Sequence, residues 1–481
     1  MEETVPAGAA TKASKSASSA YARYVFWVLY VISFLNYLDR YVIAGAANIV
    51  AKELGFRLDG IGIISSAFIL VYTLGALPLG LWADRAKRKN VVTLCVAFWS
   101  FATMTTALAV NFTTLFISRM FLGVGEAGYF PAGTAMMSDY FRRERRSRVM
   151  SLWSTAQLFG ILGGYAVGGA LAGLFIGSWR LAFICTGVPG LVLAFLASRM
   201  REPKRNEADE EARLGEQEVP EVAAEQATSA VARDVSSTTI RDELKRIALQ
   251  MRDLLRIKTL AVLIAMQVFA FFVLGVNTTF LPTYLQQSDT FAMSSGRAGL
   301  YSGVVIVLAG IVGTTLGGYM SDWLSRKYAG SRVLVCGIGF LLSAPSFALA
   351  ITYRNLFAFT IFFVLTALLI TVYTGPSTAA TQDVVPSAMR ASAVGISLLL
   401  AHLFGDAFAP SLVGILATAF DPTHGQHFLN GMAGQDLSHA LLVSCVPALL
   451  IAGLLGIWGA RWMKSDVEAA EHADSAALNN V

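Results

Sequence analysis

Gly80-Leu81-Trp82-Ala83-Asp84-Arg85 ends the second long apolar run of the sequence, and Gly318-Tyr319-Met320-Ser321-Asp322-Trp323 ends the eighth. Both hexapeptides place a glycine four residues before an aspartate. A second pair repeats at nearly the same offset, because Asp139–Arg146 follows the fourth run as Asp383–Arg390 follows the tenth. Six helices repeated in this way are typical of a secondary transporter with its site between two halves.

The composition agrees with a chain that lies in a membrane. Of 481 residues, 55% are apolar and only 14% are charged, and the mean hydropathy is +0.58. Soluble domains carry roughly 25% charged residues, which they need for a hydrated surface. This composition excludes an ordinary soluble protein.

Twelve apolar runs are long enough to cross the membrane, since a helix needs roughly 17–25 residues to span the hydrocarbon layer. Barrel strands of about ten alternating residues are excluded by the length of these runs. The sequence therefore predicts an all-α membrane protein of 12 transmembrane helices in two pseudo-symmetric six-helix bundles. The expected spans are 25–49, 62–83, 91–110, 113–138, 148–177, 180–199, 259–286, 298–323, 332–352, 355–380, 390–419 and 437–462.

The segments outside these runs define the predicted domain boundaries. We expect an N-terminal tail (1–23), a first bundle (24–199), a linker (200–258), a second bundle (259–463) and a C-terminal tail (464–481). The acidic composition of the stretch from Glu207 to Glu225 predicts that this stretch is disordered. From Arg241 to Lys258, apolar residues recur at helical spacing, which predicts an amphipathic helix that lies on the membrane surface or packs on the bundle.

The distribution of lysine and arginine between the two sides of the membrane predicts the orientation of the chain. Outside the spans, nearly all of them fall on the side of the termini and the linker. The exceptions are Lys52, Arg57, Arg180, Arg297 and Arg354. The positive-inside rule then predicts a multi-pass protein of the cell membrane with both termini in the cytoplasm. The basic pI is explained by topology, so we expect no nucleic-acid partner.

Several motifs resemble a known family. Gly80-x-x-x-Asp84-Arg85, followed by the basic run 87–89, is similar to the loop 2–3 signature of the major facilitator superfamily, and the resemblance extends from Tyr24 to Lys464. Asn36–Tyr41 in span one, Arg119–Ala127 in span four and Arg201–Pro203 after span six resemble the spinster branch. The resemblance implies the major facilitator fold and proton-driven alternating access for lysolipids or sphingoid lipids.

Four charged residues fall inside two spans. Asp39 and Arg40 lie in span one, and Arg119 and Glu126 lie in span four. A charge at the bilayer centre costs about 2.5–3.5 kcal/mol or more, so these residues should face a cavity or one another. We predict that Asp39 and Glu126 accept protons and that Arg119 tunes them, a role that the resemblance also implies for this arginine. Arg40 is expected to pair with Glu126 or to bind an anionic headgroup. The structural alternative is an ion-pair cluster that only holds spans one and four together.

Other polar residues are predicted to line the substrate cavity. His402 and Asp406 are four residues apart on one helix face, where they form either a titrating pair or a packing contact. Asn277 is the second-half equivalent of Asp39 under the repeat. The full set of cavity candidates is Arg40, Asn36, Tyr37, Asn277, Tyr373, His402 and Asp406.

The repeated loop motifs predict a cytoplasmic gate. The resemblance implies a latch between the halves, in which Asp84 meets a helix N-terminus and its neighbouring cations pair across the interface. A loop that only sets topology is the alternative for the basic run. The gate candidates are Asp84, Arg85, Arg88, Asp139, Arg146, Asp322, Arg326, Asp383 and Arg390.

Span five contains a glycine-rich segment, Gly160 to Gly169, similar to the motif of proton antiporters in the superfamily. Tyr165 stands where that motif has proline, which leaves symport and antiport both open. Tight helix packing explains the glycines equally well.

These observations predict a proton-coupled carrier of an amphipathic lipid or a related organic anion. An organic-anion symporter or a multidrug exporter of the same superfamily is the alternative, and a lipid-responsive sensor without transport is the alternative from another class. We expect no enzymatic activity, no cofactor and no metal, and the proton is the expected coupling ion. We expect the protein to be a monomer surrounded by membrane lipids.

Overall fold

The computed structural model describes residues 7–203, 208, 248–423 and 425–479. Within them the regular elements are all helical. Seven helices form the first half of the molecule. They are α1 (Ala7–Leu54), α2 (Leu58–Arg85), α3 (Arg88–Thr106), α4 (Phe112–Ala127), α5 (Tyr129–Tyr140), α6 (Arg143–Ala172) and α7 (Trp179–Ser198).

The second half repeats this pattern after the linker and ends with a helix on the terminal side. It contains α11 (Lys258–Gln286), α12 (Ser295–Ser325), α13 (Ser331–Thr352), α14 (Leu356–Thr371), α15 (Thr374–Asp383), η1 (Ser387–Met389), α16 (Arg390–Ala401), η2 (His402–Asp406), α17 (Ala409–Phe420), α18 (Gln426–Leu429), α19 (Gly434–Gly459) and α20 (Met463–Asn479).

The number of spans agrees with the prediction of twelve. Nine helices among the described residues are long and apolar enough to cross a membrane, counting α14–α15 and α16–α17 as one span each. Helix α1, helix α3 and the pair α4–α5 complete the twelve. The all-helical architecture of two repeated six-helix halves is therefore confirmed.

Three spans that the sequence predicted as continuous are interrupted. Span four breaks at Gly128, and span ten breaks between α14 and α15. Span eleven passes through a π-helical turn, His402–Asp406, before α17 begins. A proline lies in the first turn after each break (Pro131, Pro376 and Pro410). Because proline has no N–H, the carbonyl four residues before it loses its helical hydrogen bond, which interrupts the helix at that point.

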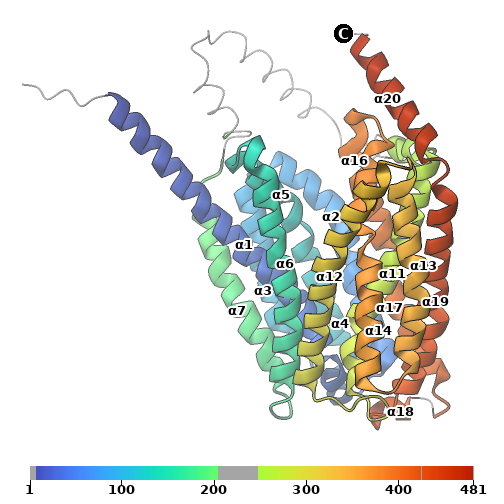
Figure 1. The fold of residues 1–481 in the computed structure, drawn as a ribbon. Helices are drawn as coiled ribbons and strands as arrows, with labels where there is room; N and C mark the ends of the chain where they lie inside the picture. The colour runs from blue at the N-terminus through green and yellow to red at the C-terminus, as the bar shows by residue number, and fades with distance from the viewer. Residues whose placement is uncertain (1–6, 204–207, 209–247, 424, 480–481) are drawn as a thin grey trace, which may run out of the picture.

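The two halves meet at one end of the molecule and diverge toward the other. We call the end where α20 and the start of α1 lie the terminal side, and the end where α18 lies the distal side. Figure 1 shows α6 and α12 close together on the distal side and spread apart toward the terminal side. Each half has its own apolar core, and the second core also includes Ala47, Ala51, Leu58 and Ile61 of the first half.

Backbone contacts close the distal side. A Cβ on Gly62 of α2 would lie 2.1 Å from the carbonyl oxygen of Pro410 in α17, and a Cβ on Gly169 of α6 would lie 2.3 Å from that of Ser295 in α12. The Ser66 hydroxyl also accepts a hydrogen bond from the Ser411 backbone N–H at 3.0 Å. Glycine permits this close approach of helices, as it does in many membrane proteins.

The linker prediction falls mostly outside the described residues, including the expected disordered stretch. The described end of the expected amphipathic helix is helical over 248–254. There Leu254 is fully buried in the second core and Met251 packs against it. This part of the segment therefore packs on the bundle.

Candidate functional site

The charged residues of spans one and four meet inside the first half. The Arg40 guanidinium donates two hydrogen bonds to Oε2 of Glu126, from Nη2 at 2.8 Å and from Nε at 3.1 Å. The Glu126 side chain is fully buried, and that of Arg40 is 15% exposed. A buried pair with this geometry compensates two charges that neither helix could hold alone.

Arg119 does not form an ion pair with either carboxylate among the described contacts. Its guanidinium is buried, and it donates to the backbone carbonyls of Asp39 (3.4 and 3.5 Å) and Arg40 (3.3 Å). The side chain thus fastens α4 to the backbone of α1 beside the Arg40–Glu126 pair.

Asp39 lies at the same place but without a strong partner. It is fully buried, and within the described part of the chain neither of its carboxylate oxygens has a hydrogen-bond partner. Oε1 of Glu126 is also buried and has no hydrogen-bond partner among the described residues. An ionised carboxylate oxygen without a hydrogen-bond donor is costly in such surroundings.

Aromatic rings enclose the Arg40 guanidinium. Its Cζ lies 4.5 Å from the ring centre of Tyr72, 4.9 Å from that of Tyr37 and 5.2 Å from that of Phe68. Tyr37 was a predicted cavity residue, whereas Phe68 and Tyr72 of α2 were missed. The four-residue spacing of these two rings on one helix face was the available signal.

The second half contributes a polar pair opposite Tyr72. Nδ1 of His402 lies 3.0 Å from a carboxylate oxygen of Asp406, within the π-helical turn. The His402 ring meets Phe271 edge-on at 4.7 Å and Tyr72 at 6.3 Å between ring centres. Tyr72 therefore lies near both Arg40 of the first half and His402 of the second half, which links the polar residues of the two halves.

The remaining cavity candidates lie in more ordinary surroundings. The Asn277 amide donates to the Val273 carbonyl of its own helix at 2.7 Å. Tyr373 is buried and packs on Phe340 with 5.2 Å between ring centres. Asn36 is also buried, and its amide nitrogen has no hydrogen-bond partner within the described residues.

On the terminal side, the gate motifs form two equivalent ion pairs. Arg88 pairs with Asp139 in the first half, and Arg332 pairs with Asp383 in the second. In both pairs the arginine precedes the aspartate by 51 residues. Arg332 also lies 3.8 Å from Asp322. The repeat was recognised from the sequence, but Arg332 itself was missed.

The other gate candidates lie around these pairs. Arg146 donates to the Ser138 carbonyl at 2.6 Å. Asp84 and Arg85 lie exposed at the end of α2, and Arg326 and Arg390 lie exposed at the ends of α12 and α16. The predicted gate residues therefore share the terminal side, where the two halves diverge.

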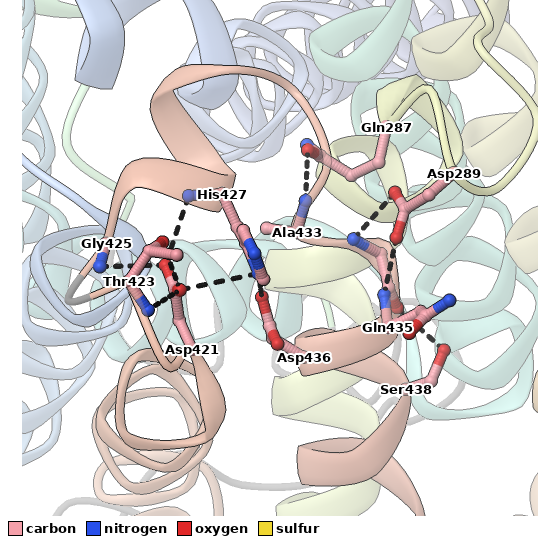
Figure 2. A network of polar contacts seen from close by, with 11 residues as sticks. Gln287, Asp289, Asp421, Thr423, Gly425, His427, Ala433, Gln435, Asp436 and Ser438 are labelled. Carbon is pink, nitrogen blue, oxygen red and sulfur yellow. Dashed lines mark hydrogen bonds and ion pairs between the residues drawn. The ribbon is translucent and has the colours of Figure 1, made fainter.

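The distal loop between α17 and α19 contains a network that the sequence did not indicate (Figure 2). Asp421 accepts hydrogen bonds from the backbone N–H groups of Thr423, Gly425 and His427 and from the Thr423 hydroxyl. Nδ1 of His427 lies 3.0 Å from Asp436 and 3.3 Å from Asp421. These three side chains have the spacing of metal ligands, but the four donors on Asp421 already account for its position as the organiser of the loop.

Residues 29–410 match the family profile of the Major Facilitator Superfamily. The chain belongs to this superfamily. Its fold and its family are those of transporters and not of enzymes.

The curated relatives place the chain near the spinster proteins. It is 25% identical to Protein spinster of Drosophila melanogaster over 80% of this chain, and it spans 60% of that protein. It is 25% identical to the sphingosine-1-phosphate transporter SPNS2 of Xenopus tropicalis over 91% of this chain and 81% of the relative. The probable L-galactonate transporter of Escherichia coli is 28% identical over 81% of both chains. The resemblance to the spinster branch is therefore confirmed.

A solved structure shares the fold. The crystal structure of a bacterial homolog of the human lysosomal transporter spinster, inward-facing and unoccupied, has a TM-score of 0.78 at 22% identity. The match covers 93% of this chain and 98% of that one. This likeness confirms the architecture of the two halves.

Proposed function

We propose that this protein is a proton-coupled secondary transporter that carries an amphipathic lipid, of the lysolipid or sphingoid type, or a related organic anion. The observation that carries the proposal is the Arg40–Glu126 pair, which lies beside the unpartnered carboxylate of Asp39. Both carboxylates lie in one buried cluster, with Asp39 inside α1 and Glu126 at the end of α4 beside the break in span four. An ionisable group inside a membrane span is costly, and such groups commonly serve ion or substrate pathways.

The ion pair suggests how a proton and an anion exchange. In the resting pair, Glu126 occupies two donors of Arg40. A proton on Glu126 removes the opposing charge and frees the guanidinium for a phosphate or carboxylate group of the substrate. Release of the substrate restores the pair, and Glu126 gives up its proton. Asp39 is the second proton carrier, and Arg119 holds the two helices in register.

Two relatives support an anionic substrate by their names. Sphingosine 1-phosphate carries a phosphate group and L-galactonate carries a carboxylate. Both groups fit a guanidinium enclosed by Tyr37, Phe68 and Tyr72. The relative that carries a sugar acid favours an organic-anion symporter as the second candidate function.

The excess of basic residues on the terminal side supports a cytoplasmic location for that side. The described state, closed on the distal side, would then be inward-facing, as in the structural relative. Transport would proceed by rocking of the two halves, and the Arg88–Asp139 and Arg332–Asp383 pairs would take part in closing the cytoplasmic gate.

The test uses the full chain in proteoliposomes. A thermal-shift screen of lysolipids, sphingoid bases and sugar acids first identifies a ligand, and counterflow and uptake driven by a pH gradient are then compared. Asp39→Asn and Glu126→Gln should abolish gradient-driven uptake while the protein stays folded. Full coupled transport by both variants would refute the proton assignment. If sugar acids alone stabilise the protein, the substrate is an organic anion and not a lipid. Binding of a ligand without proton flux would indicate a sensor.

A further inference from the structure

One hydrogen bond crosses between the halves at the position where Tyr165 replaces the proline of the glycine-rich motif. The Tyr165 hydroxyl of α6 donates to the backbone carbonyl of Thr278 in α11 at 2.5 Å. Tyr165 is fully buried and Thr278 is half-buried, so the bond is partly shielded from solvent. A helix carbonyl normally accepts from the N–H four residues later and needs no tyrosine from another helix.

A proline explains why this carbonyl is available. The residue four positions after Thr278 is Pro282, which lies inside α11 and has no N–H. The Thr278 carbonyl therefore lacks its helical donor. A partly buried carbonyl without a donor is costly, and the Tyr165 hydroxyl supplies the missing hydrogen bond.

The backbone of α6 is fixed at the same residue. The Tyr165 carbonyl oxygen lies very close to two neighbouring helices. A Cβ added to Gly299 of α12 would lie 2.2 Å from this oxygen, and a Cβ added to Gly45 of α1 would lie 2.6 Å from it. The Tyr165 ring packs against Tyr41 with 5.4 Å between ring centres. Helix α6 is thus held between α1 and α12, and the reach of the hydroxyl toward Thr278 is determined by packing.

We propose that the Tyr165–Thr278 hydrogen bond is a latch that holds the distal side closed, and that Tyr165 is a positioning residue of the transport cycle. Opening the distal side separates α6 from α11, which breaks this bond and leaves the Thr278 carbonyl without a protein donor. The latch therefore biases the equilibrium toward the state that is closed on the distal side. This inference rests on the proposed alternating access but on no assumption about the proton or the substrate.

The experiment measures distances across the distal side in full-length protein in nanodiscs. Spin labels are placed at Leu108 and Phe357, two exposed distal residues of opposite halves, in a background whose four native cysteines are replaced by alanine. Pulsed electron paramagnetic resonance then gives the ratio of open to closed populations. Tyr165→Phe should raise this ratio about tenfold, as expected for the loss of one intramolecular hydrogen bond.

Two further variants identify the cause. Pro282→Ala restores the helical N–H that competes for the Thr278 carbonyl, so Tyr165→Phe should have a much smaller effect in that background. Tyr301→Phe is the matched control, because the Tyr301 hydroxyl bonds Thr360 at 2.8 Å within the second half, and it should leave the ratio unchanged.

An unchanged ratio in Tyr165→Phe, or an equal change in Tyr301→Phe, would overturn the latch. An undiminished effect of Tyr165→Phe in the Pro282→Ala background would overturn the role of the proline. Because the readout is a distance, it stands even where proton-driven uptake is absent, so failure of the latch is distinguishable from failure of the proposed function.

Discussion

Arg40 of α1 and Glu126 of α4 form a buried ion pair at 2.8 Å, which joins the two helices that carry the intramembrane charges of this protein. Removing one partner leaves the other charge uncompensated, so Arg40→Gln should lower the free energy of unfolding by about 3–5 kcal/mol. The double variant Arg40→Gln/Glu126→Gln should be more stable than Arg40→Gln alone, because both charges are then gone. Thermal unfolding in detergent compares the parent, the two single variants and the double variant.

A double variant as unstable as the sum of the single variants would contradict this prediction. That result would mean that the two side chains contribute through packing with Tyr37, Phe68 and Tyr72 and that their mutual charge compensation is negligible.

The two equivalent gate pairs should differ in strength. Arg88 faces Asp139, whose side chain is 5% exposed, whereas Arg332 faces Asp383, whose side chain is 34% exposed. Water screens the second pair more, so Arg332→Gln should cost about 0–1 kcal/mol. Arg88→Gln leaves a buried carboxylate without this partner and should cost about 3 kcal/mol. Comparison of the two unfolding temperatures checks the difference, and equal losses would refute it.

The sequence revealed the architecture and the charged cluster for physical reasons. Lipid forces spans to be long and apolar, so the twelve runs were visible, and Asp39, Arg40, Arg119 and Glu126 stood out as charges inside them. The contacts that these charged side chains make could not be predicted from the sequence. Pairing of Arg40 with Glu126 was predicted only as one of two options, and the contacts of Arg119 with backbone carbonyls have no sequence signal.

The missed residues share one property. Phe68 and Tyr72 are apolar residues in an apolar span, and Arg332 follows a loop whose basic run is degenerate in the second half. Their roles depend on which helices are neighbours, and tertiary packing decides that. The breaks in spans four, ten and eleven were also missed, although Pro131, Pro376 and Pro410, which have no N–H for a helical hydrogen bond, were their signals.

Gly62 should be sensitive to a single methyl group. A Cβ at this position would lie 2.1 Å from the Pro410 carbonyl oxygen across the two halves, and neither backbone can move without separating α2 from α17. Gly62→Ala should therefore raise the distal-open population and lower the stability of the closed state by about 1–3 kcal/mol. The distal distance measurement and thermal unfolding test both effects.

Gly310→Ala is the matched control for this substitution. A Cβ at Gly310 of α12 meets nothing within 4 Å among the described residues, so this variant should keep the parent distances. A distal-open shift of the same size in both variants would show that helix propensity, and not the clash with Pro410, is responsible.

His427 should make stability depend on pH. It lies in the distal loop outside the spans, and its pKa is raised above the ordinary 6.5, first by the hydrogen bond to Asp436 and then by the nearby charges of Asp421, Asp436 and Asp289. A raised pKa means that the folded protein binds this proton more tightly. The stabilisation is complete below the ordinary pKa and is lost as the pH rises through the raised value.

The unfolding temperature between pH 5.5 and 8.5 tests this dependence. The parent should lose more stability with rising pH than His427→Gln, in which the titrating group is absent. His439→Gln removes an exposed histidine near the same end of the molecule and should retain the slope of the parent. Asp421 does not contribute to the pH dependence in this range. Although burial alone would raise its pKa, hydrogen bonds from Thr423, His427 and Gly425 hold it below the ordinary 3.8, so its contribution is lost only at lower pH. A slope that is equal in the parent and in His427→Gln would show that the contact with Asp436 does not depend on protonation.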